Sequence, residues 1–115
     1  MHKLIIMIET PEDEMAFDAA WPEFLDTAER LPGLVQEATV RVDKILFGNA
    51  QINIIHELFF NSAAELDYAM NSPPGQLTGQ VLQTLTGGRM LLMTAEHRQD
   101  DIENIRKYKP HVDTD

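Results

Sequence analysis

The spacing of apolar residues predicts four strands and three helical stretches along the chain. Short apolar runs with β-branched residues, bounded by polar or turn residues, are typical of strands. Apolar residues that recur every three or four positions are typical of amphipathic helices. The predicted strands are Leu4–Ile8, Val35–Phe47, Ile52–Phe60 and Arg89–Glu96. The predicted helical stretches open at Thr10–Glu14, at Ser62 and after Gly75.

The first helix has the clearest periodicity. Phe17, Trp21, Leu25 and Ala28 follow one another at spacings of four, four and three, and so share one helical face. Pro22 falls inside this pattern and lacks the N–H group of an internal helical hydrogen bond. We therefore expect a kink or a restart at Pro22.

In chain order the elements read β-α-β-β-α-β, which is the split βαβ unit. The second helical region is divided by the break at Ser72–Gly75. We predict an α+β, ferredoxin-like domain over residues 1–97, with a four-stranded antiparallel sheet and helices on one face. Residues 98–115 are predicted to form a polar tail in which Ile102, Ile105 and Tyr108 have the spacing of a short helix.

Charge and cysteine content exclude several classes of function. The 115 residues include no cysteine, so disulfides, thiolate metal sites and a cysteine nucleophile are excluded. The formal net charge is −10, and the stretch from Glu9 to Glu29 holds eight acids and no base. Nucleic acids and anionic membranes repel such a surface, because binding to them needs Lys and Arg. We therefore expect no nucleic-acid or membrane partner.

The apolar run Leu4–Ile8 is too short for the core of a signal peptide or for a membrane span. A cytoplasmic location is the expectation that follows. The four histidines show no spacing typical of metal ligands, and none has an acid one helical turn away on a predicted helix. We expect neither a metal nor another cofactor.

A set of short motifs occurs in a characteristic order between residues 3 and 97. The motifs are Pro11-Glu12-Asp13, Ala16-Phe17, Trp21, Leu31-Pro32-Gly33-Leu34, Glu57-Leu58-Phe59-Phe60-Asn61-Ser62 and Ser72-Pro73-Pro74-Gly75-Gln76. Single motifs of this kind carry little information, but the ordered set is more specific. In this order the sequence resembles the EthD family, within the dimeric α+β barrel superfamily.

The resemblance implies a ferredoxin-like protomer whose sheet packs face to face with the sheet of a partner, and hence a homodimer. It also implies a cleft between the other sheet face and the helices. Superfamily relatives use this cleft for polyketide cyclisation, lactone isomerisation, cofactor-free oxygenation or haem chemistry. The family usually carries a histidine one turn after the aromatic residue of the first helix. Here the stretch 22–27 has none, and Gln80 or Val81 stands where the family favours an aspartate.

His56 is the candidate catalytic residue. It lies in an apolar strand, on the same side as Ile54, Leu58 and Phe60. Because the family's equivalent of Phe60 packs under the helices, we expect His56 to face the cleft, where it could act as a general base or orient a ligand. The alternative is a core or interface histidine that is satisfied by a hydrogen bond.

The residue that orients His56 must come from a neighbouring strand or from the first helix. Glu57 follows His56 directly and points to the opposite face of the strand, so we expect it to face the partner sheet. Glu23, on the first helix, is the carboxylate that we expect to be nearest.

Apolar side chains of the strands and of the first helix could line the cleft. The candidate ligand-binding residues are Trp21, Phe24, Ile5, Met7, Leu91 and Met93. The same residues would also serve as an ordinary core. The residues expected to face the partner are Leu4, Ile6, Ile8, Ile55, Phe59, Leu92 and Val40 or its neighbours.

Two functions remain open on the sequence. The chain could be a small metal-free enzyme of the EthD kind that acts on an apolar or aromatic molecule in a degradative or isomerising step, with His56 as the base. It could instead be a non-catalytic small-ligand binder or a structural homodimer. The absent histidine of the first helix favours the second function, and the degradative associations of the family favour the first.

Overall fold

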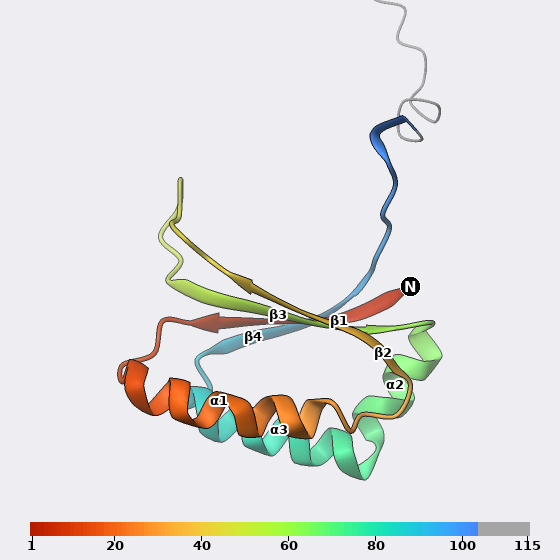
Figure 1. The fold of residues 1–115 in the computed structure, drawn as a ribbon, viewed down its shortest axis with the longest axis horizontal. Helices are drawn as coiled ribbons and strands as arrows, with labels where there is room; N and C mark the ends of the chain where they lie inside the picture. The colour runs from red at the N-terminus through yellow and green to blue at the C-terminus, as the bar shows by residue number, and fades with distance from the viewer. Residues whose placement is uncertain (104–115) are drawn as a thin grey trace, which may run out of the picture.

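The computed structural model describes residues 1–103, which form one four-stranded antiparallel sheet with three helices on one face (Figure 1). The strands are β1 (His2–Glu9), β2 (Leu34–Arg41), β3 (Ile52–Phe60) and β4 (Met90–Glu96). The helices are α1 (Glu14–Ala28), α2 (Ala63–Asn71) and α3 (Pro73–Thr86). The predicted α+β, ferredoxin-like order of elements is therefore confirmed. Ile105 and Tyr108 of the predicted tail helix lie outside the described residues.

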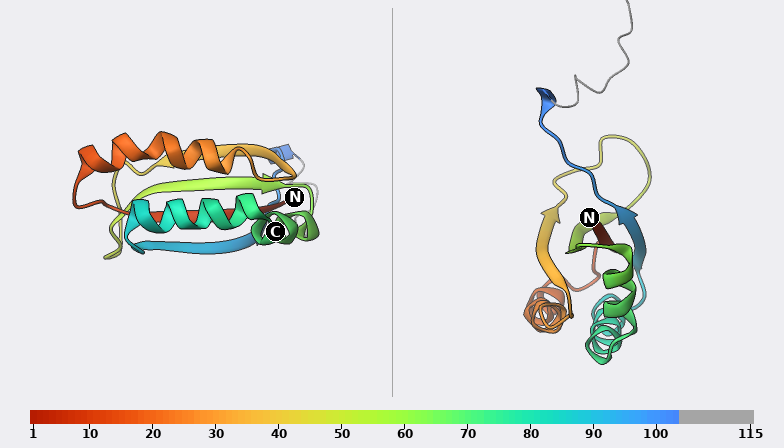
Figure 2. Two further views of the ribbon diagram at one scale, coloured as in Figure 1. Left: turned by 90° about the horizontal axis from the view of Figure 1, so that it is seen from below. Right: turned by 90° about the vertical axis from the view of Figure 1, so that its right-hand side faces the viewer.

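The strand order is β2-β3-β1-β4, so the first strand of the chain lies in the middle of the sheet. β1 pairs with β3 and β4, and Ile6 lies opposite both His56 and Leu92. α1 and α3 run side by side below the sheet, with α1 toward β2 and α3 toward β4 (Figure 2). One face of the sheet is covered by helices, and the other face carries none of the three helices of residues 1–103.

α1 continues through Pro22 as one helix, so the predicted restart is wrong. Proline removes one hydrogen bond, which would have run to the carbonyl group of Asp18. Asp18 and Pro22 both lie on the exposed side of the helix, where water can satisfy that carbonyl group. The helix begins at Glu14, one residue after Asp13, whose side chain accepts a hydrogen bond from the Ala16 N–H at 3.0 Å.

β2 ends at Arg41, six residues before the predicted end at Phe47. Val42 N–H still donates to the carbonyl group of Asn53 at 3.0 Å, but the chain then leaves the sheet. β3 begins only at Ile52, so residues 43–50 lie outside the sheet of residues 1–103, and the Gln51 carbonyl group accepts a hydrogen bond from the Thr10 N–H at 2.8 Å. The segment between the two strands instead projects from the face opposite to the helices (Figure 1).

The core lies between β1, β3 and the helices. Leu4, Ile6 and Ile8 are all buried there. The prediction that these three residues face a partner is therefore wrong. β1 is apolar at both alternating sets of positions, so its pattern alone does not show which set the helices cover.

On the outer strand β4, the face predicted for Leu92 is also the wrong one. Leu92 lies opposite Ile6 and so belongs to the helix side, although it was predicted to face a partner. Val40, Ile55 and Phe59 do lie on the open face, as expected. Among the helices of residues 1–103, none combines the length and the apolar character needed to cross a bilayer.

Candidate functional site

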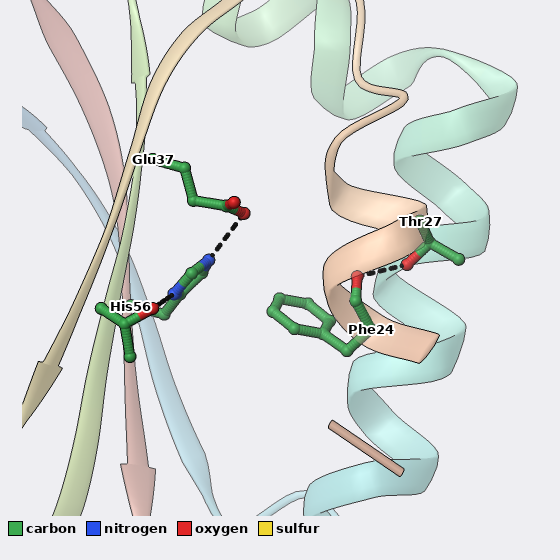
Figure 3. A network of polar contacts seen from close by, with 5 residues as sticks. Phe24, Thr27, Glu37 and His56 are labelled. Atoms are coloured by element: carbon green, nitrogen blue, oxygen red, sulfur yellow. Dashed lines mark hydrogen bonds and ion pairs between the residues drawn. The ribbon is translucent and has the colours of Figure 1, made fainter. Parts of the chain in front are cut away.

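His56 lies between the sheet and α1, with its ring directed toward the helix (Figure 3). Its side chain is fully buried, at 0% exposure. The rings of Trp21 and Phe24 meet it edge-on, at centroid distances of 5.3 and 5.6 Å. The structure thus brings three of the predicted site residues together in one aromatic cluster.

Both ring nitrogens of His56 have hydrogen-bond partners on β2. Nε2 lies 2.9 Å from Glu37 Oε2, and Nδ1 lies 3.0 Å from Thr39 Oγ1. An ionised carboxylate can only accept, so the Nε2 atom carries the proton. In a neutral ring Nδ1 then accepts, and the Thr39 hydroxyl donates to it. His56 is therefore held in one orientation by two hydrogen bonds to β2.

The residues that orient His56 were missed in the sequence, where Glu23 was the expected partner. Glu37 and Thr39 lie at alternate positions of the predicted strand Val35–Phe47, where polar side chains by themselves indicate a solvated face. The signal that could have found them is register, because Thr39 lies opposite His56 in the β2–β3 ladder. Alternate residues of a strand share a face, which places Glu37 beside Thr39.

The other four predicted ligand-binding residues do not join this cluster. Ile5 lies opposite Met93, and Met7 lies opposite Leu91. Neighbours of Leu4, Ile6 and Ile8 must point away from the helices, since successive side chains alternate between faces. The predicted placement of these four residues in one cleft with His56 is wrong. Whether any of them contacts a ligand stays a prediction.

A groove of about 780 Å³ lies between α1 and α3. Its lining comes from one side of each helix, the end of β1, the loop between β1 and α1 and the turn before β4. The lining residues are Ile8, Glu9, Pro11, Glu12, Asp13, Ala16, Phe17, Ala20, Glu23, Leu77, Gln80, Val81, Thr84, Leu85, Thr86, Gly87 and Arg89. His56 is not among them. Phe17 lines the groove and stacks on Trp21 at 5.5 Å, so the groove adjoins the aromatic cluster.

Charged groups of both signs line the groove. Its carboxylates belong to Glu9, Glu12, Asp13 and Glu23, and its cation is Arg89. Arg89 pairs with Glu12 at 3.3 Å and donates a second hydrogen bond to the carbonyl group of Thr10 at 3.4 Å. Residues 1–103 hold no group of three or more His, Cys, Asp or Glu side chains placed to bind a metal ion.

The open face of the sheet carries an ion pair between its two central strands, β1 and β3. Lys3 pairs with Glu57 of the same protomer, and both side chains are largely buried. The Lys3 ammonium group also lies 5.3 Å from the centre of the Phe59 ring, whose edge-on neighbour is His97 at 5.0 Å. Glu57 thus faces away from the helices, as predicted, and it has an intramolecular partner there.

No family model matches the chain, and a comparison with curated proteins also gave no match. Solved structures do match. An EthD family protein from Bacillus halodurans is 26% identical to this chain, with a TM-score of 0.79; the match covers 85% of this chain and 99% of that protein. The resemblance to the EthD family is therefore confirmed by the structure of this EthD family protein, which shares the fold over nearly its whole length.

Two more distant structures show the same fold. A dimeric ferredoxin-like protein of unknown function from Jannaschia is 21% identical, with a TM-score of 0.62 over 84% of this chain and 100% of that protein. SnoaB, a cofactor-independent oxygenase from Streptomyces nogalater, is 14% identical, with a TM-score of 0.64 over 86% of this chain and 94% of that one.

Proposed function

We propose that this chain binds a small apolar or aromatic molecule in the groove between α1 and α3, and that it does so as a homodimer. The observation that carries the proposal is the groove itself. Its volume of about 780 Å³ falls within the usual range for small-molecule sites. Phe17, Val81 and Leu85 provide apolar walls, and Ile8 contributes from the sheet.

The geometry supports ligand binding in the groove more than it supports catalysis by His56. A general base must reach the proton that it removes, directly or through one water molecule. His56 is enclosed by Trp21 and Phe24, and both of its nitrogens already have partners. The non-catalytic binder is therefore the function that we favour over an enzyme with His56 as its base.

The open sheet face supports the homodimer. Val40 and Leu91 are exposed there, and Ile5, Met7 and Ile55 lie between them only partly buried. A continuous apolar patch on one face of a small domain is typical of an interface. The similar protein from Jannaschia is described as dimeric. A second copy placed face to face would remove this patch from water.

Ligand binding can be tested with 2-phenylethanol, a small neutral aromatic probe, by following the chemical shifts of the groove residues in NMR. We expect shifts at Phe17, Ala20 and Val81 that saturate with added probe. Ala20→Trp would fill the groove and abolish them. Ala19→Trp is the matched control, because Ala19 is an exposed neighbour on the same helix that does not line the groove. Equal binding by both variants would refute the groove as the site.

The homodimer has its own test. Light scattering at micromolar protein concentration should give twice the mass of the 13.1 kDa chain. A monomer mass under these conditions would refute the dimer without affecting the result of the ligand test.

A further inference from the structure

We infer that the groove between α1 and α3 selects ligands whose polar end is an amine or an alcohol, and discriminates against carboxylates. This inference rests on the proposed ligand-binding function and adds the chemical class of the ligand to it. It follows from the distribution of charge around the groove.

The acidic groups of the groove come from the end of β1, the loop before α1 and α1 itself. Glu9 ends β1, Glu12 and Asp13 precede α1, and Glu23 follows further along the same helix. The residues that α3 contributes, from Leu77 to Thr86, carry no charge. A ligand in the groove therefore meets carboxylates from the segment between β1 and α1 and from α1, and neutral side chains from α3.

The cation of the groove does not reverse this balance. Arg89 is engaged by the carboxylate of Glu12 and the carbonyl group of Thr10. An anionic ligand would have to compete with Glu12 for the guanidinium group. It would also approach the carboxylates of Glu9, Asp13 and Glu23.

The two helix ends at the groove also disfavour an anionic ligand. The N-terminus of α1 would attract an anion, but the side chain of Asp13 already accepts the Ala16 N–H there. Thr86 and Gly87, at the C-terminus of α3, also line the groove. The carbonyl groups at a helix C-terminus carry partial negative charge and favour a cation.

The expected preference is moderate because the residues that carry the carboxylates are exposed to water, which weakens their interaction with a ligand charge. For groups separated by several ångströms near a surface, we expect an amine to bind about tenfold more tightly than a carboxylate of similar shape at low ionic strength. Raising the salt concentration to about 0.5 M should reduce the ratio to about twofold, since the screening length then falls to a few ångströms.

The test compares 2-phenylethylamine, 2-phenylethanol and 3-phenylpropionate by NMR titration at low and high salt. We expect the amine to bind most tightly and the carboxylate most weakly. Glu23→Gln should lower the preference for the amine, whereas Glu29→Gln should leave it unchanged. Glu29 is an exposed acid at the end of α1 that does not line the groove, so it removes the same charge from the protein.

Three results would count against the inference in different ways. Tighter binding of 3-phenylpropionate than of the alcohol would overturn it while leaving the proposed function intact. Equal effects of Glu23→Gln and Glu29→Gln would show that the preference comes from the overall charge of the protein and not from the groove. Failure of all three probes to bind would refute the proposed function and this inference together.

Discussion

His56 Nε2 on β3 lies 2.9 Å from Glu37 Oε2 on the edge strand β2 (Figure 3). His56 is fully buried, whereas the Glu37 side chain retains 23% exposure. The contact therefore links the interior of the sheet to its edge strand, on the face that α1 covers. This arrangement indicates that His56 holds β2 in register with β3, and it argues against a role for His56 in binding a substrate.

Glu37→Ala should lower the free energy of unfolding by about 1–3 kcal/mol, because it leaves the buried Nε2–H of His56 without an acceptor. Glu37→Gln should cost less, since the amide oxygen can still accept that hydrogen bond. Urea denaturation of both variants measures the difference. Equal losses for the two variants would argue that the carboxylate charge matters more than the hydrogen bond.

His56→Ala should lower the free energy of unfolding by about 2–4 kcal/mol, because it opens a cavity beside Trp21 and Phe24 and leaves Glu37 and Thr39 without their partner. The affinity of the folded fraction for 2-phenylethanol should remain unchanged. Melting temperature and NMR titration on the same variant separate the two effects. Lost affinity with normal stability would return His56 to the ligand site.

The order of the elements could be predicted from the sequence because it depends on local signals. Caps formed by Asp13 and Ser62 open α1 and α2, and Gly87 ends α3 in the left-handed conformation. Which alternate residues of β1 face the helices could not be predicted. Ile5 and Ile6 are equally apolar, and only the position of the helices decides which of them is buried.

The candidate site was predictable in part for the same reason. Trp21, Phe24 and His56 meet because their periodicity places them on the buried sides of α1 and β3. The contact of Glu37 with His56 depends on the register between β2 and β3. The alternation of apolar residues does not reveal this register for a polar edge strand. The groove arises from the spacing of two helices, which is a tertiary property.

Gly75→Ala should destabilise the protein by about 2–3 kcal/mol or more, because α2 and α3 meet there too closely for a side chain. An added Cβ atom would lie 2.1 Å from the carbonyl oxygen of Ala69 and 2.7 Å from that of Met70. Both atoms belong to the backbone and cannot move aside easily.

Gly79→Ala is the matched control in the same helix. An added Cβ atom at Gly79 meets nothing within 4 Å. Alanine should therefore stabilise α3 by about 0.5–1 kcal/mol through the lower conformational entropy of the unfolded chain. Thermal unfolding of the two variants should shift in opposite directions. Similar shifts would show that α2 and α3 can separate at Ser72 without cost.

Leu46→Ser combined with Phe47→Ser should weaken the proposed homodimer. These side chains are 86% and 98% exposed in the protomer. They belong to the segment between β2 and β3, which projects on the side of the open sheet face (Figure 1). An exposed apolar segment next to an exposed apolar face would be buried by a second copy packed against that face. We expect the dissociation constant of the dimer to rise by about tenfold or more, as for the loss of an apolar anchor.

Met15→Ser provides the control for this prediction, because Met15 is 84% exposed on α1, in the helical layer of the molecule. Sedimentation equilibrium should give the wild-type dissociation constant for this variant. The absence of cysteine allows a second measurement, in which Phe47→Cys carries the single fluorescent label of the chain. Its emission should shift to shorter wavelength as the protein concentration passes through the dissociation constant, because the label leaves water. A label that stays in water while the dimer forms would exclude this segment from the interface.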